Sequence, residues 1–144
     1  MAKEILVGYG VDLDAVSGWL ESASSAGSIV DVSRGMFAGE VGTPRLVQLF
    51  ARFGIRATWF VPGHSLETFP KEVDQVLSAG HEVGLHGYSH ESLLELSAEQ
   101  EEAILAHCVE LVEQRSGKRP RGYITPSWEM SPATLGLLLK YGLR

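Results

Sequence analysis

A chain of 144 residues is long enough for one domain of ordinary size, and a hydrophobic fraction of 44% excludes a disordered protein. The formal net charge of −6 offers no basic surface for nucleic acid, and no stretch is long and apolar enough to cross a bilayer. The first apolar run is too short for a signal peptide, and Cys108, the single cysteine, cannot form an internal disulfide. We therefore expect a cytoplasmic protein that binds neither nucleic acid nor membrane.

The chain opens with a predicted buried strand that leads into two carboxylates. Residues 4–11 form a short apolar run rich in strand formers and bounded by glycine. Asp12 and Asp14 follow this run two residues apart. Because side chains alternate along an extended chain, both carboxylates can face the same side.

The following segment is predicted to be irregular before a clear helix begins. Residues 15–23 can form a short helix. Residues 24–42 are rich in serine and glycine and are predicted to be a long functional loop that carries Glu40. Thr43 and the proline after it have the chemistry of a helix start, with threonine as N-cap. Gly54 is expected to end that helix.

Three further strand–helix units are predicted in the rest of the chain. Ser97 and Gln100 have the capping-box pattern that begins a long helix. Strands that alternate with helices imply an α/β fold with a parallel sheet and right-handed crossovers. Strands are expected at residues 56–61 and 122–124, and residues 79–85 are expected to form a turn and a short buried strand. The helices are expected at residues 70–79, 97–117 and 131–142.

Polar side chains follow the predicted strands at the point where each strand ends. His64 follows the second strand, His86 and His90 follow the third, and Trp128 lies after the fourth. In parallel α/β folds the chemistry collects at the carboxyl ends of the strands. These side chains and the two aspartates are therefore predicted to share one edge of the sheet.

The residue types at this edge favour a metal site. Asp14, His86 and His90 form a two-histidine, one-carboxylate set that suits a divalent metal, with zinc as the expected ion, and leaves a position for water. Asp12, left unligated nearby, is the candidate base for that water. A plain structural reading stays open, in which the aspartates are loop or N-cap carboxylates and the histidines are a loop and a surface residue.

Three other side chains are candidates for substrate binding. They are His64 at a strand end, Glu40 in the predicted loop and Trp128 in the loop after the fourth strand. His64 can instead simply cap its loop, and nothing in the sequence decides between the two roles. His81 precedes its strand at the opposite end from the site, so it is interpreted as structural.

These motifs resemble the polysaccharide deacetylase family, carbohydrate esterase family four, and most closely its peptidoglycan deacetylase-like, cyclic imidase-like and allantoinase-like branch. The first motif of the family has neighbouring aspartates; here one residue separates them, and the resemblance makes Asp12 the base and Asp14 the ligand. The second motif, a histidine, a serine or threonine, two residues and a histidine, matches residues 86–90 with Gly87 at the hydroxyl position. The third matches residues 123–128, where no arginine precedes the proline–aromatic turn.

The resemblance implies a distorted (β/α) barrel and a hydrolase of non-peptide C–N bonds. Its substrate would be an N-acetylated sugar of peptidoglycan or a small cyclic imide or ureide; the lack of an export signal favours the second. The later motifs, which supply an acidic residue and the histidine that acts as general acid, are absent. Residues 1–144 are therefore interpreted as a single partial domain, the N-terminal half of the barrel.

Three consequences of this interpretation stay open. A half-barrel has an uncovered sheet edge, so self-association into a homo-oligomer is expected. A chain that keeps the metal ligands but lacks the acid can be an inactive metal-binding or scaffold fragment, which a measurement of bound metal and turnover on one sample would reveal. The metal-free chemistry of the allantoinase-like members predicts no bound ion.

Overall fold

The computed structural model describes residues 3–20 and 28–143. At its centre lies a three-stranded parallel sheet in the order β1–β2–β3, formed by Gly10–Asp12, Thr58–Val61 and Glu82–Leu85. The α-helices are α1 Ser17–Leu20, α2 Ile29–Phe37, α3 Thr43–Phe53, α4 Gly63–Thr68, α5 Pro70–Ser78, α6 Ala98–Ser116 and α7 Thr134–Tyr141. A π-helix, η1 Ala38–Gly42, and two 3₁₀ turns, η2 Leu93–Glu95 and η3 Pro126–Trp128, complete the elements.

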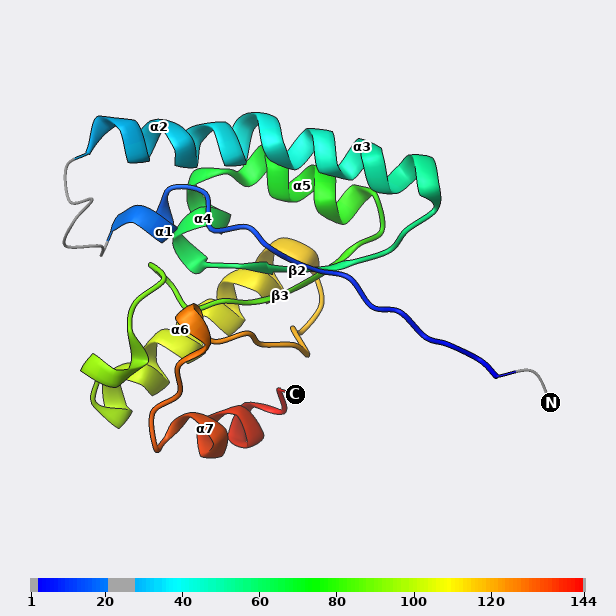
Figure 1. Cartoon of the computed structure of the whole chain (residues 1–144). Coiled ribbons are helices and arrows are strands. Elements are labelled where there is room, and N and C mark those ends of the chain that lie inside the picture. Colours follow the sequence, from blue (N-terminus) through cyan, green and yellow to red (C-terminus); the bar gives the residue numbers. More distant parts are fainter. Residues whose placement is uncertain (1–2, 21–27, 144) are drawn as a thin grey trace.

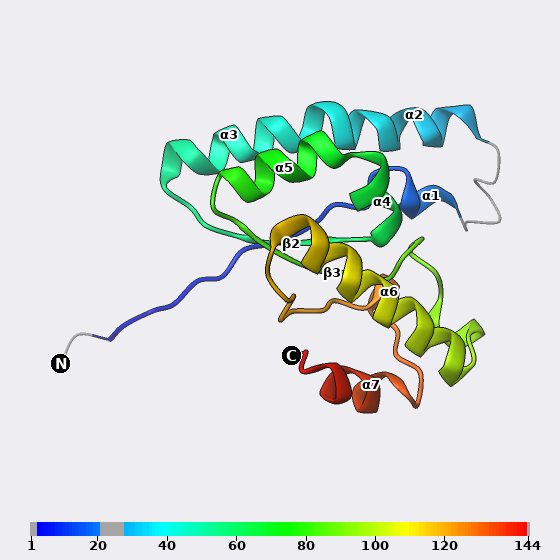
Figure 2. The same cartoon turned by 180° about the vertical axis from the view of Figure 1, so that it is seen from behind.

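The helices lie on both sides of the strands. Helices α2, α3 and α5 lie above the sheet, and α6 and α7 lie below it (Figure 1). Helix α6 packs against β3, as the view from behind also shows (Figure 2). Parallel strands joined by helices are the predicted α/β arrangement, and none of the helices in the described residues is long and apolar enough to cross a membrane.

The two faces of the sheet differ in how they are covered. Trp59 and Val61, on one face of β2, are buried in the main core with side chains from the helices. Phe60 points to the opposite face and is half-buried. Its ring lies so close to Gly84 that an added Cβ there would come within 2.9 Å of it. The register pairs Asp12 with Phe60, so the aspartate end of β1 belongs to this less covered face.

Helix α6 begins and ends as the sequence predicts. The Oγ of Ser97 accepts a hydrogen bond from the backbone N–H of Gln100 at 3.3 Å, and the side chain of Gln100 accepts one from the N–H of Ser97 at 2.8 Å. This pair is the predicted capping box. At the other end, Gly117 adopts a left-handed conformation with φ of 70°, which glycine tolerates without a Cβ penalty.

The predicted first strand is wrong in its extent. Only Gly10–Asp12 joins the sheet, while residues 3–9 are exposed and run away from the body of the molecule (Figure 1). Ile5 is 75% exposed. The reason is that β2 begins at Thr58, so the chain before Tyr9 has no strand opposite it.

The predicted functional loop at residues 24–42 is also wrong where the structure describes it, since residues 21–27 lie outside the described chain. From Ile29 onward α2, η1 and α3 form one unbroken helical run. Ser28 is the N-cap, and Thr43, predicted to cap α3, is itself helical with φ of −58°. Pro44 cannot donate to the preceding turn, and the wider π-turn just before it accommodates that loss.

Two other predicted segments are only partly right. The expected loop after β2 is helix α4, which places His64 in a first helical turn. The expected fourth strand is a single parallel bridge between Leu85 and Tyr123. Helix α7 starts at Thr134, after its predicted start, and ends at Gly142 as expected.

Replacing Gly35 with alanine is expected to destabilise the protein by about 1–3 kcal/mol through overpacking. A Cβ at this position in α2 would lie 2.7 Å from the backbone oxygen of Ala15, in the turn directly after Asp14. Gly136→Ala is the matched control, because its Cβ meets nothing within 4 Å and the change improves helix propensity by up to about 1 kcal/mol. Urea unfolding measures the free energy of unfolding of both variants. Equal stabilities would contradict the predicted clash.

Protonation of His81 is expected to destabilise the folded chain. The ring is buried, and its Nδ1 accepts the backbone N–H of Ala57 at 3.2 Å. Burial, and then the charge of Arg56, lower the pKa of His81 below its ordinary 6.5. The folded state thus binds fewer protons than the unfolded state between that lowered pKa and 6.5, so the free energy of unfolding falls as pH drops through this window.

Urea unfolding between about pH 5 and pH 7.5 measures the effect of His81. The variant His81→Asn keeps a hydrogen-bond acceptor but does not titrate, so its stability should depend less on pH than that of the unmodified protein. Parallel pH curves for the two proteins would contradict this prediction.

Candidate metal centre

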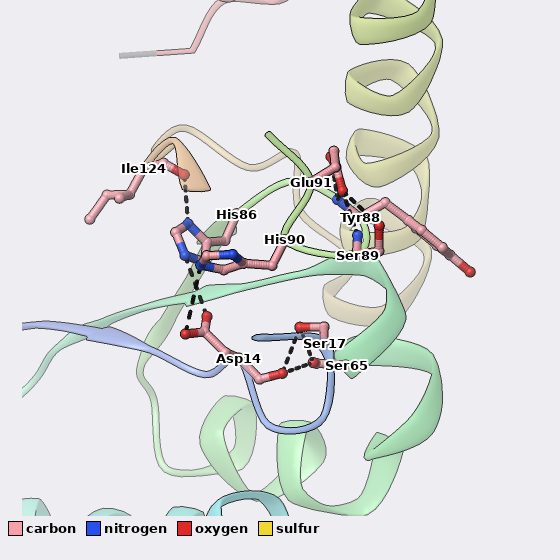
Figure 3. Close-up of polar contacts among 9 residues, drawn as sticks. All are labelled: Asp14, Ser17, Ser65, His86, Tyr88, Ser89, His90, Glu91 and Ile124. Atoms are coloured by element: carbon pink, nitrogen blue, oxygen red, sulfur yellow. Dashed lines mark hydrogen bonds and ion pairs between the residues drawn. The ribbon is translucent and has the colours of Figure 1, made fainter. Parts of the chain in front are cut away.

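The structure brings Asp14, His86 and His90 together, although the first follows β1 and the other two follow β3 (Figure 3). One ligand atom from each lies within 4.8 Å of the others. The Nε2 of His86 is 3.4 Å from Oδ1 of Asp14, and the Nε2 of His90 is 4.0 Å from Oδ2. Both carboxylate oxygens therefore face an imidazole nitrogen.

The donor atoms of this cluster fit a divalent cation. The Nδ1 of His86 lies 2.7 Å from the backbone oxygen of Ile124. A carbonyl oxygen only accepts, so Nδ1 carries the proton and Nε2 presents its lone pair toward Asp14. The buried Oδ1 of Asp14 has no hydrogen-bond partner in the described chain. Two nitrogens and a carboxylate oxygen that lacks a partner are the ligand types that zinc accepts.

Two buried serines fix the backbone that carries Asp14. The hydroxyl oxygens of Ser17 and Ser65 lie 2.6 Å and 2.5 Å from the backbone oxygen of Asp14 (Figure 3). Both serines are fully buried, and they come from α1 and α4 respectively. The carbonyl that precedes the turn at Ala15, where φ is 48°, is therefore tied to two helices.

The carboxylate of Glu91 holds the loop between the two histidines. It accepts hydrogen bonds from the backbone N–H of Tyr88 at 3.0 Å and of Ser89 at 2.6 Å (Figure 3). Glu91 is only 4% exposed. A Cβ on Gly87 would lie 2.7 Å from the same carboxylate, which explains a glycine with φ of 67° at this position. Glu91 thus shapes the loop that places His90, whose own φ is 65°.

A buried thiol lies beneath the same loop. The Sγ of Cys108 donates to the backbone oxygen of Gly87 at 3.3 Å. Burial, and then the charge of Glu91, raise the pKa of the Cys108 thiol to about 12. The thiol therefore stays protonated and unreactive at neutral pH.

Asp12 and Trp128 border the cluster. Together with Ser127 they line the hollow of about 230 Å³ that contains the three candidate ligands. Asp12 is exposed at the end of β1, and its carboxylate forms no hydrogen bond with the described residues. Trp128 is 83% exposed at the rim, on a turn where it and Ser127 both have positive φ.

The other two predicted substrate residues lie elsewhere. Glu40 and His64 line a separate hollow of about 460 Å³ between the α2–η1 run and helices α4 and α5. Because Glu40 is part of a helix rather than of the predicted functional loop, it lines a different hollow from the candidate ligands. The Nδ1 of His64 is buried without a hydrogen-bond partner in the described chain.

Sequence reasoning missed several residues that build this centre. Glu91 and Ser65 were not singled out, because their roles depend on backbone groups that only the fold brings near. The carbonyl of Ile124 has no side-chain signal at all. The one available hint was a glutamate directly after the second histidine, and such a residue is common in solvated loops.

The chain resembles proteins of known family along its whole length. The family described as Polysaccharide deacetylase matches residues 31–144. Over 144 residues the chain is 56% identical to "Peptidoglycan deacetylase" of Helicobacter pylori, and over 143 residues it is 41% identical to "Peptidoglycan deacetylase-like protein FGM2" of Gibberella zeae. These matches cover 100% and 97% of this chain, but only 49% and 42% of the two relatives.

A solved structure gives the same picture. A Mycobacterium smegmatis protein assigned to the polysaccharide deacetylases superposes with a TM-score of 0.87 at 34% sequence identity. The match covers 94% of this chain and 48% of that protein. The chain thus spans about half the length of the proteins it matches, and its fold corresponds to part of a (β/α) barrel.

Proposed function

The chain belongs to the polysaccharide deacetylase family, and from this premise we propose that it carries the metal centre of a hydrolase that removes acetyl groups from the N-acetylated sugars of peptidoglycan. The observation that supports the proposal is the meeting of Asp14, His86 and His90 around one point, with Asp12 in the same hollow. The names of the relatives from Helicobacter pylori and Gibberella zeae indicate the substrate class.

The residues of the centre have distinct roles in this proposal. Asp14, His86 and His90 would hold the divalent ion, for which zinc is the expected metal. Such an ion, when bound, lowers the pKa of a water molecule and polarises a carbonyl group. Asp12 would accept a proton from the attacking water, since its carboxylate is exposed and not hydrogen-bonded within the described chain.

The reaction is a simple amide hydrolysis. The oxygen of water bonds to the acetyl carbon, the carbon–nitrogen bond breaks, and the nitrogen gains a proton to leave as the free amine, with acetate as the second product. Trp128 would offer the exposed face of its indole to a sugar ring at the rim. Glu40 and His64, in their separate hollow, would contact a more distant part of a glycan.

Metal content and acetate release, measured on the same purified protein, test the proposal. We expect about one zinc per chain and acetate release from peptidoglycan or N-acetylglucosamine oligomers. Asp12→Asn should keep the metal and lose turnover, because only the base is removed. A metal-loaded protein that releases no acetate, but opens a succinimide ring, would favour the cyclic imide reaction; turnover of neither would favour the scaffold alternative. Cytoplasmic location and self-association stay predictions.

A further inference from the structure

A second hollow, of about 390 Å³, borders the two aspartates, and it differs in lining from the one that contains the candidate ligands. Asp12 and Asp14 line both hollows. The second one is bounded by the helical run α2–η1–α3 and by two tryptophans, Trp19 and Trp59. We call it the Arg34 groove, after the side chain that lines it from α2.

The indole of Trp59 lacks an acceptor in this groove. Trp59 is 1% exposed, and its Nε1 has no hydrogen-bond partner in the described chain. An indole nitrogen can only donate, and a buried donor without an acceptor is rare in folded proteins. A ligand oxygen in the groove that Trp59 lines would satisfy it.

The guanidinium of Arg34 has unused donors. Its Nη1 donates to Oδ1 of Asp31 at 2.9 Å, and no other hydrogen bond of this guanidinium involves the described chain. Arginine carries five N–H donors in a planar fork that matches a carboxylate. With 64% of its side chain exposed, Arg34 can reach a ligand without a change in the fold.

The charges of the groove favour an anionic group at its Arg34 end. Arg34 is the single Lys or Arg among the described lining residues. In the proposed function, Asp14 is a metal ligand and Asp12 faces the attacking water, so neither carboxylate is available to a second cation. Leu46 and Trp59 contribute an apolar wall that suits the ring and methyl carbons of a substrate.

We propose that the Arg34 groove binds a carboxylate next to the scissile acetamide, so that the protein prefers N-acetylmuramic acid residues that lack a stem peptide to N-acetylglucosamine residues. This inference rests on the proposed deacetylase function and specifies its substrate. The two sugars of peptidoglycan differ in a lactyl ether on the ring carbon beside the acetamide. This ether ends in a free carboxylate wherever no stem peptide is attached to it. An acetyl group placed at the aspartates therefore puts that carboxylate toward the neighbouring groove.

Titration of the zinc-loaded protein with each sugar, followed by the tryptophan indole signals in ¹H–¹⁵N spectra, tests the proposal. The indoles are assigned by replacing each tryptophan with phenylalanine. We expect N-acetylmuramic acid to bind about tenfold or more tightly than N-acetylglucosamine and to shift the Trp59 indole signal. Arg34→Gln should make the affinities for the two sugars about equal. Arg34→Lys should keep only part of the preference for N-acetylmuramic acid.

Arg52→Gln is the matched control, since it removes the same charge from an exposed position of α3 that does not line the groove. The proposal would be overturned if the unmodified protein bound the two sugars with equal affinity. It would also be overturned if Arg34→Gln lowered the affinity for both sugars by the same factor. Acetate release from both sugars with equal binding would contradict this inference alone. A preserved carboxylate preference without acetate release would contradict the deacetylase function alone.

Discussion

Asp14→Ala is expected to weaken zinc binding by more than about a hundredfold, because loss of an outer partner of a metal ligand alone costs about 10–100-fold. Asp14 is the only carboxylate of the candidate set, and both of its oxygens face an imidazole nitrogen. Its removal leaves two neutral nitrogens for a doubly charged ion. Competition of the protein with a chromophoric chelator measures the affinity directly.

Thermal unfolding supplies a second measurement of the same variant. Zinc that binds only the folded state raises the melting temperature of the unmodified protein, and the increase should vanish in Asp14→Ala. Asp74→Ala is the control, because it removes an exposed carboxylate of α5 that pairs with Arg115 and is not one of the candidate ligands. Unchanged zinc affinity in Asp14→Ala would show that the cluster is not the metal site.

The second large effect is expected at Glu91. Glu91→Ala leaves the backbone N–H groups of Tyr88 and Ser89 without their acceptor, at about 1–3 kcal/mol of stability for each group that stays buried. The same change should weaken zinc binding about 10–100-fold, because His90 sits on the loop that Glu91 holds. Glu91→Gln keeps one acceptor oxygen, so its stability and its zinc affinity should lie between those of Glu91→Ala and those of the unmodified protein.

Affinity and stability together separate a positioning role for Glu91 from a merely structural one. A structural role predicts lower stability with zinc affinity unchanged in the fraction that stays folded. Glu95→Ala, an exposed change in the neighbouring turn η2, should alter neither quantity. A folded Glu91→Ala with normal zinc affinity would contradict the role assigned here.

The sequence predicts the candidate centre well because its elements are local. Asp14 directly follows a strand, and the histidine pair lies four residues apart after another strand, so a parallel sheet alone brings them to one edge. Helix ends with glycine, such as Gly117 and Gly142, are also local and were placed correctly. Each of these signals depends on a few neighbouring residues.

The features that the sequence does not predict depend on distant parts of the chain. Gly35 and Gly39 have weak helix propensity, and close packing of Gly35 against the turn at Ala15 and of Gly39 against Phe69 outweighs it. The apolar residues Ile5–Val7 look like a strand, but pairing requires a neighbour that β2 does not provide. Glu40 is predicted to lie in a long functional loop, and the helix that forms instead holds it in another hollow.

The protonated state of Cys108 has a practical use for spectroscopy. It is the only cysteine of the chain, and its sulfur is shielded beneath the histidine loop. The thiolate is the form of cysteine that attacks maleimides and thiol-reactive nitroxide labels, so these reagents should leave the protonated Cys108 untouched at neutral pH. A cysteine introduced at an exposed position such as Arg52 would then take up a label selectively.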